Sequence, residues 1–103
     1  MEIKWIHLNP DKISGEEILE FRNRVIEHEG AASQVEIEAL ERQIVESAKD
    51  GTQYNLVALK NENIVAWASG IFSKVRLTDM IRMLFFDTDI LGEQGVDNLL
   101  YQL

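Results

Sequence analysis

The sequence contains no cysteine, which excludes disulfide bonds, thiolate nucleophiles and thiolate metal sites. Basic residues are also scarce, because ten Lys and Arg stand against eighteen Asp and Glu, for a formal net charge of -8. A surface of this charge repels nucleic acids and anionic membranes, so we expect neither as a partner. His7 has no His or Cys near it in the sequence, and we therefore expect no metal site.

Long apolar runs are absent as well. No stretch approaches the roughly twenty residues that cross a bilayer, and the N-terminus lacks the features of a signal peptide. The chain shows no internal repeat, low-complexity tract or linker. With 46% apolar and 27% charged residues, its composition is that of a globular protein. We therefore expect one cytoplasmic domain over residues 1–103.

The first half of the chain predicts one strand followed by two helices. Residues 2–8 alternate imperfectly between apolar and polar side chains, which favours a strand. Two capping boxes follow, each a Ser with a Glu three residues later, and apolar residues then recur at helical spacing. A glycine marks the expected end of each helix. The first helix begins at the pair Ser14 and Glu17 and is expected to end near Gly30. The second begins at the pair Ser33 and Glu36 and is expected to end at Gly51.

The second half predicts a hairpin, a further strand and a short helix. Residues 54–59 and 64–72 are apolar runs around a polar turn, and Met80 to Phe86 is another apolar run. The last helix presents Val96 and Leu99 on its apolar face. The predicted fold class is α/β: a mixed, mostly antiparallel four-stranded sheet with helices in the order β-α-α-β-β-β-α.

Between the last strand and the last helix lies a loop with two glycines, Gly92 and Gly95. A strand that enters a glycine-bearing turn leaves the first N–H groups of the next helix unpaired, which favours an anion such as a phosphate. This loop is acidic, however, and no Lys or Arg lies near it in the sequence. Its backbone thus predicts a cofactor site while its charge opposes one. The acidic residues are Asp87, Asp89, Glu93 and Asp97.

Three segments of this pattern resemble the GNAT N-acetyltransferase superfamily. Residues 18–27, ILEFRNRVIE, are similar to the first helix of the family, and residues 56–68, LVALKNENIVAWA, to its central hairpin. Residues 92–100, GEQGVDNLL, resemble its pyrophosphate loop and the pair of leucines that follows. The resemblance implies an N-acetyltransferase, or a degenerate remnant of one, that transfers acetyl from acetyl-CoA to an amine. It leaves the acceptor amine and the catalytic residues unidentified.

The resemblance also implies a set of cofactor-binding residues. Two of them depart from the family pattern, since the family has Arg or Gln at the position of Gly92 and Gly or Ala at that of Asp97. His28 and Glu29 fall near the acceptor pocket of the family, although a His at a helix C-terminus is also favoured by the helix dipole. The implied cofactor-binding residues are Phe85, Asp87, Gly92, Glu93, Gln94, Gly95, Val96 and Asp97.

In the family, a further strand, a helix and usually two more strands build the other wall of the cofactor cleft. This sequence does not contain them, and we expect a second copy to supply the wall. An apolar strand with a free edge and no bulge is a template for pairing, so we expect a homodimer through Met80 to Phe86 and the last helix. Two alternatives stay open: a non-catalytic acyl-CoA-binding or protein-interaction module, and a small acidic dimeric assembly protein.

Overall fold

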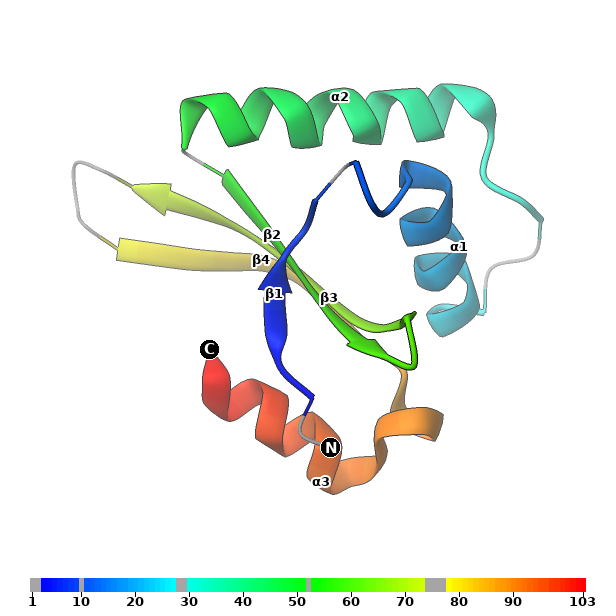
Figure 1. The fold of residues 1–103 in the computed structure, drawn as a ribbon, viewed down its shortest axis with the longest axis vertical. Helices are drawn as coiled ribbons and strands as arrows, with labels where there is room; N and C mark the ends of the chain where they lie inside the picture. The colour runs from blue at the N-terminus through cyan, green and yellow to red at the C-terminus, as the bar shows by residue number, and fades with distance from the viewer. Residues whose placement is uncertain (1–2, 10, 28–29, 52, 74–77) are drawn as a thin grey trace.

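The protein is described by a computed structural model over residues 3–9, 11–27, 30–51, 53–73 and 78–103. Four strands form one sheet in the order β1-β2-β3-β4, and every neighbouring pair is antiparallel. The predicted α/β class and element order are therefore confirmed (Figure 1). The elements are β1 Trp5–His7, α1 Gly15–Val25, α2 Gln34–Asp50, β2 Gln53–Lys60, β3 Asn63–Ser73, β4 Thr78–Phe86 and α3 Thr88–Gln102.

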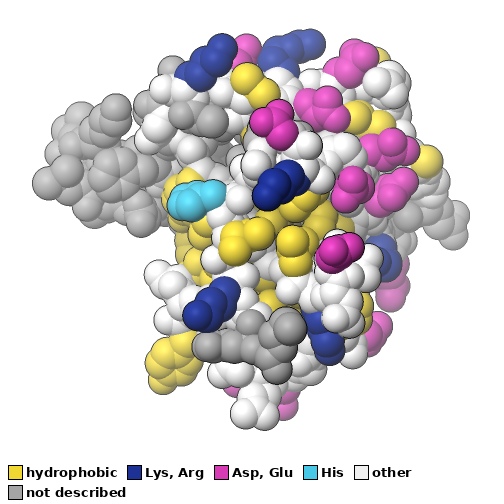
Figure 2. Space-filling model, in the orientation of Figure 1, with side chains coloured by type: hydrophobic (Ala, Val, Ile, Leu, Met, Phe, Trp, Pro, Cys, Tyr) yellow, Lys and Arg dark blue, Asp and Glu magenta, His cyan; other side chains and the backbone are white. Residues whose placement is uncertain are grey.

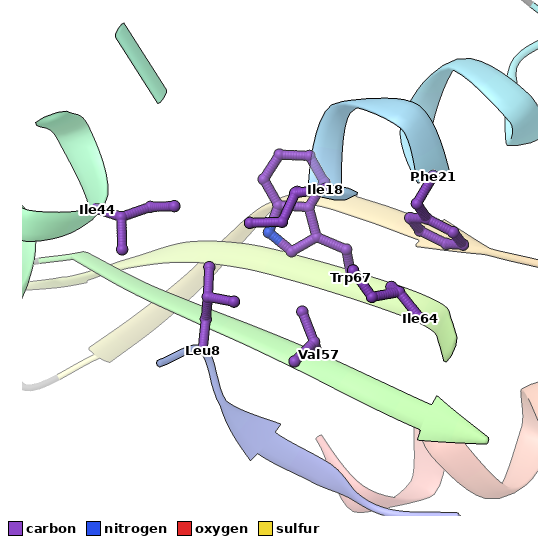
Figure 3. Packing of buried hydrophobic residues seen from close by; sticks show 7 residues of the cluster. All are labelled: Leu8, Ile18, Phe21, Ile44, Val57, Ile64 and Trp67. Carbon is purple, nitrogen blue, oxygen red and sulfur yellow. The ribbon is translucent and has the colours of Figure 1, made fainter. Parts of the chain in front are cut away.

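The sheet separates two layers of helices. Helices α1 and α2 lie on one face of the sheet and α3 lies on the other (Figure 1). On the α1 and α2 side, Ile18 of α1 and Ile44 of α2 point towards Trp67 and Val57 of the sheet (Figure 3). On the α3 side, Leu99 is fully buried against three small residues. These are Ala58, Val65 and Ala66. Leu99 of the apolar face predicted for the last helix is thus covered by the sheet of the same chain, whereas Leu100 and Leu103 are each 44% exposed.

Two β-bulges change which side chains share a face. In β3 the pairing passes from Ala58↔Ala66 to Leu59↔Ile64, so Val65 is an extra residue. In β4 the pairing passes from Ser69↔Met83 to Gly70↔Ile81, so Arg82 is extra. The expectation that the apolar strand Met80 to Phe86 carries no bulge is therefore wrong. A bulge depends on how two strands pair, which the alternation within one strand does not specify.

The predicted capping box of Ser33 and Glu36 is present. That of Ser14 and Glu17 is present in part, since the Glu17 carboxylate bonds the Ser14 hydroxyl, at 3.4 Å, in place of the Ser14 backbone N–H. The N–H of Glu17 donates to Ser14 Oγ at 3.2 Å, and the N–H of Glu36 donates to Ser33 Oγ at 3.2 Å. The carboxylate of Glu36 accepts from the Ser33 backbone N–H at 3.4 Å and lies 3.5 Å from Arg22. The backbone hydrogen bond from Ser33, with smaller contributions from the Ser33 hydroxyl and Arg22, lowers the pKa of Glu36 below its ordinary value of 4.5.

Two helix boundaries differ from the prediction. Helix α1 ends at Val25 rather than near Gly30, because the chain leaves the helical conformation at Glu27, where φ is 56°. Helix α3 begins at Thr88 rather than after the glycine loop. The end of α2 before Gly51, at φ 66°, is confirmed. No helix among the described residues is both long and apolar enough to span a membrane.

Candidate functional site

The candidate site lies where β4 turns into α3, and Asp87 determines its shape. The backbone N–H of Asp87 donates to the carbonyl of the bulge residue Val65 at 2.8 Å, which extends the β3–β4 pairing by one bond. The Asp87 carboxylate accepts from the N–H of Ile90 at 3.2 Å and so caps the first turn of α3. An Asp directly after an apolar strand therefore starts a helix here, before the first glycine is reached.

Arg24 of α1 joins this helix start to the rest of the protein. Its guanidinium lies 3.0 Å from Asp87 Oδ2, donates to the Ile64 carbonyl at 3.3 Å and sits 5.6 Å above the ring of Phe21. The Asp87 side chain is 11% exposed, whereas that of Arg24 is 56% exposed. Sequence reasoning missed this cation because Arg24 lies far along the chain, on a helix whose local pattern does not specify a partner. Both Asp87 oxygens are engaged, so Asp87 serves first to position α3.

A cavity of about 350 Å³ opens beside this ion pair. It lies between the end of α1 and the start of α3, and three carboxylates around it outweigh one guanidinium. Such a lining favours a cationic group over a phosphate. The lining residues are Arg24, Val25, Glu27, Phe86, Asp87, Thr88, Asp89 and Ile90. His28 and Glu29, which the resemblance places near the acceptor pocket, lie outside the described residues.

Gly92 breaks α3 into two helical segments. Its φ of 69° and ψ of 172° are essentially restricted to glycine, and a Cβ added there meets nothing within 4 Å. The break starts a second helical segment directly after Gly92, and in general it is the first N–H groups of a helix that lack intrahelical partners. The space beside Gly92 is open. The glycine loop predicted before the last helix is therefore replaced by a break one turn into α3.

The other predicted residues of the loop lie on the second segment of α3. Gly95 is inside the helix, and a Cβ added to it would lie 3.1 Å from Leu91 Cβ, so this glycine serves close packing within the helix. Asp97 is not a cap, since it lies past the first turn of this segment. Glu93, Gln94 and Asp97 are exposed and Val96 is half-buried.

Phe85 lies apart from the other predicted cofactor-binding residues. Its ring stacks on Trp67 at a centroid distance of 5.7 Å, and it packs into the core on the α1 and α2 side of the sheet. The structure therefore brings Gly92, Glu93, Gln94, Gly95, Val96 and Asp97 together on α3. Asp87 joins them at the start of that helix. Within the part of the chain that is described, no group of His, Asp and Glu is arranged to hold a metal ion.

Comparisons with known proteins give matches in structure. No family model matches the chain, and no curated protein sequence matches it significantly. A predicted acetyltransferase from Clostridium acetobutylicum, crystallised with acetyl-CoA, is similar with a TM-score of 0.64 and 15% identity over 97% of this chain and 70% of that chain. The PaiA N-acetyltransferase from Thermoplasma acidophilum, in complex with coenzyme A, is similar with a TM-score of 0.61 and 15% identity. The match covers 99% of this chain and 69% of that chain. Over these lengths, the chain shares the fold of these two acetyltransferases.

Proposed function

We propose that the chain binds acetyl-CoA at the junction of β4 and α3 and takes part in acetyl transfer to an amine. The observation that carries the proposal is the helix start behind Gly92, on a fold shared with two acetyltransferases crystallised with acetyl-CoA or coenzyme A. The N–H groups of Glu93, Gln94 and Gly95 begin the second segment of α3 and suit an anion. Acetyl-CoA bound there would supply the thioester that an amine attacks.

The charges around α3 set the strength of this binding. Glu93 and Asp97 are exposed carboxylates on the segment that would receive a pyrophosphate. A carboxylate about 4 Å from a phosphate charge costs about 1 kcal/mol in water, which is about fivefold in affinity. Arg24, the cation that lines the neighbouring cavity, is held by Asp87. The site therefore favours weak, salt-sensitive binding of the cofactor.

The same carboxylates suit the second substrate. Glu27, Asp87 and Asp89 line the cavity of about 350 Å³ beside the start of α3. A protonated amine is attracted to such a cavity, and an exposed carboxylate can accept its proton before attack. The proposal therefore places the amine on the α1 side of Asp87 and the cofactor on the side of Gly92.

Isothermal titration with acetyl-CoA and with coenzyme A tests the binding. Asp97→Asn and Glu93→Gln remove the opposing charges, and we expect each to tighten binding by about fivefold at low salt. Glu46→Gln on the exposed face of α2 is the matched control, since it changes the net charge equally and lies on another helix. Equal effects of all three variants would mean that only the net charge matters. No heat and no thermal shift at millimolar acetyl-CoA would contradict the proposal.

Transfer is tested separately from binding. The protein has no cysteine, so any thiol that a thiol reagent detects comes from released coenzyme A. We expect thiol release that depends on both acetyl-CoA and an added amine, measured across diamines, polyamines, amino acids and peptides. Binding without thiol release for any amine would exclude the transfer step and favour the non-catalytic acyl-CoA-binding alternative.

A further inference from the structure

The two edges of the sheet are protected to different degrees. At the β1 edge, the side-chain amide of Gln102 accepts from the Trp5 N–H at 3.1 Å and donates to the Ile3 carbonyl at 2.9 Å. The Trp5 indole N–H also donates to the Leu99 carbonyl at 2.8 Å. The end of α3 thus bonds one backbone group of β1 and one just before it, which a neighbouring strand would otherwise pair. This edge is therefore partly covered.

The part of the chain that the structure describes places no comparable cover over the β4 edge. Strand β4 runs over nine residues, Thr78–Phe86, and pairs with β3 on one side only. Among the described residues, no backbone group outside the sheet bonds to β4. A strand of this length with unpaired N–H and C=O groups is a template for another strand.

Both faces of β4 are apolar at this edge. The extra residue Arg82 places Ile81 and Met83 on opposite faces of the sheet, and their side chains are 43% and 40% exposed. Each adjoins a hollow that the chain does not fill. The hollow of about 440 Å³ beside Ile81 includes Tyr54 and Leu56, and the hollow of about 350 Å³ beside Met83 includes Ile71.

We infer that β4 pairs with β4 of a second copy of this chain, antiparallel and about a two-fold axis, to form one continuous sheet. The strand is self-complementary, because it brings the same unpaired backbone groups and the same apolar residues on both faces. Its sequence holds one Asp and one Arg, so it is neutral in a chain of net charge -8. Acidic side chains gather over α1 and α2, in the upper right of Figure 2, where two copies would repel.

The dimer would also extend the candidate site, although it stands independently of acetyl-CoA binding. In an antiparallel pair, the end of β4 at Phe86 lies next to the beginning of β4 in the second copy. The start of α3 therefore gains a second wall from that copy. The buried face of α3 around Leu99 takes no part, because the sheet of the same chain already covers it.

Sedimentation velocity and light scattering over a range of concentrations test the pairing. We expect a dimer at high micromolar protein, and Ile81→Lys and Met83→Lys to weaken it by at least about tenfold, since a buried Lys at the new strand pair is costly. Val35→Lys on α2, where the side chain is 76% exposed, is the matched control and leaves the dissociation constant unchanged. Wild-type protein that stays monomeric at high micromolar concentration overturns the inference, as does equal weakening by all three variants.

A cross-linking experiment on the assembled protein reports the contact itself. The chain lacks cysteine, so Ile81→Cys and Met83→Cys each introduce one thiol. Opposed residues of an antiparallel pair have Cα atoms about 4.5–5.5 Å apart, within the range of a disulfide. In a two-fold pair only the residue on the axis opposes its own copy, so we expect oxidation to give a covalent dimer for Ile81→Cys alone, for Met83→Cys alone or for an equimolar mixture of the two, according to the register. We expect none for Val35→Cys. Two results overturn the pairing at β4. One is a Val35→Cys variant that cross-links as efficiently as the β4 cysteine variants, and the other is a dimeric sample in which no β4 cysteine cross-links.

Discussion

The ion pair between Arg24 and Asp87 gives the sharpest test of how the candidate site is built. Replacing Asp87 with Ala removes the acceptor for the Ile90 N–H and the partner of the Arg24 guanidinium. The start of α3 then loses its cap, and Arg24 keeps only the Ile64 carbonyl and the ring of Phe21. We expect the protein to unfold at a lower urea concentration and the first turn of α3 to fray.

The size of the effect follows from these contacts. Loss of an Asp cap costs about 1 kcal/mol. The ion pair adds about 0.5–1 kcal/mol, at the upper part of the range for surface pairs, because Asp87 is 11% exposed while Arg24 is 56% exposed. Asp87→Ala should therefore destabilise by about 1.5–2 kcal/mol, and Asp87→Asn, which keeps an acceptor for Ile90, by about half as much.

Urea unfolding of the wild type, both single Ala variants and the double variant measures this directly. With an m-value of about 1–2 kcal/mol per molar, the midpoint of Asp87→Ala should fall by about 1 M. The double-mutant cycle should give a coupling of about 0.5–1 kcal/mol. Asp89→Ala, at an exposed acidic position of the same turn, is the control and should cost only a few tenths of a kcal/mol. A coupling of zero between Arg24 and Asp87 would refute the reasoning.

Three further predictions concern α3 and α2. Leu99→Ala should destabilise by about 3 kcal/mol in urea unfolding, because Leu99 is fully buried against Ala58, Val65 and Ala66; a loss below about 1 kcal/mol would mean that α3 is not docked as described. Gly92→Ala should cost about 1–3 kcal/mol through its φ of 69° and ψ of 172°, although the space beside it is open, and a neutral result would contradict that conformation. The lowered pKa of Glu36 stabilises the fold above the ordinary pKa of 4.5, and this contribution is lost as pH falls through the folded pKa; an NMR titration should show Glu36 titrating below 4.5, and normal titration would contradict the capping geometry.

Local signals in the sequence predicted most of the fold. The Ser33 and Glu36 box, like that of Ser14 and Glu17, involves residues three apart, so its geometry is contained in the sequence itself. Gly51 ends α2 because its backbone adopts φ 66°, which glycine tolerates. The order of strands followed from apolar runs and turns. These features depend little on the rest of the chain.

One error was local: the last helix was predicted to begin after the glycines, whereas Asp87 follows β4 directly and starts α3 with its own carboxylate. The other errors arose where distant segments decide the structure. The bulge at Arg82 exists only in the pairing of β4 with β3. Arg24 became part of the site because α1 packs beside the end of β4, which no pattern within either segment indicates.

The central proposal is that acetyl-CoA binds where Gly92 breaks α3, and backbone NMR tests it most directly. At 11.8 kDa the protein suits a ¹⁵N titration in which every amide is followed separately. Addition of acetyl-CoA should shift the amides of Glu93, Gln94 and Gly95 most, with smaller shifts at the end of β4. Saturating acetyl-CoA that leaves these three amides unmoved, or that shifts only amides elsewhere in the chain, would contradict the proposal.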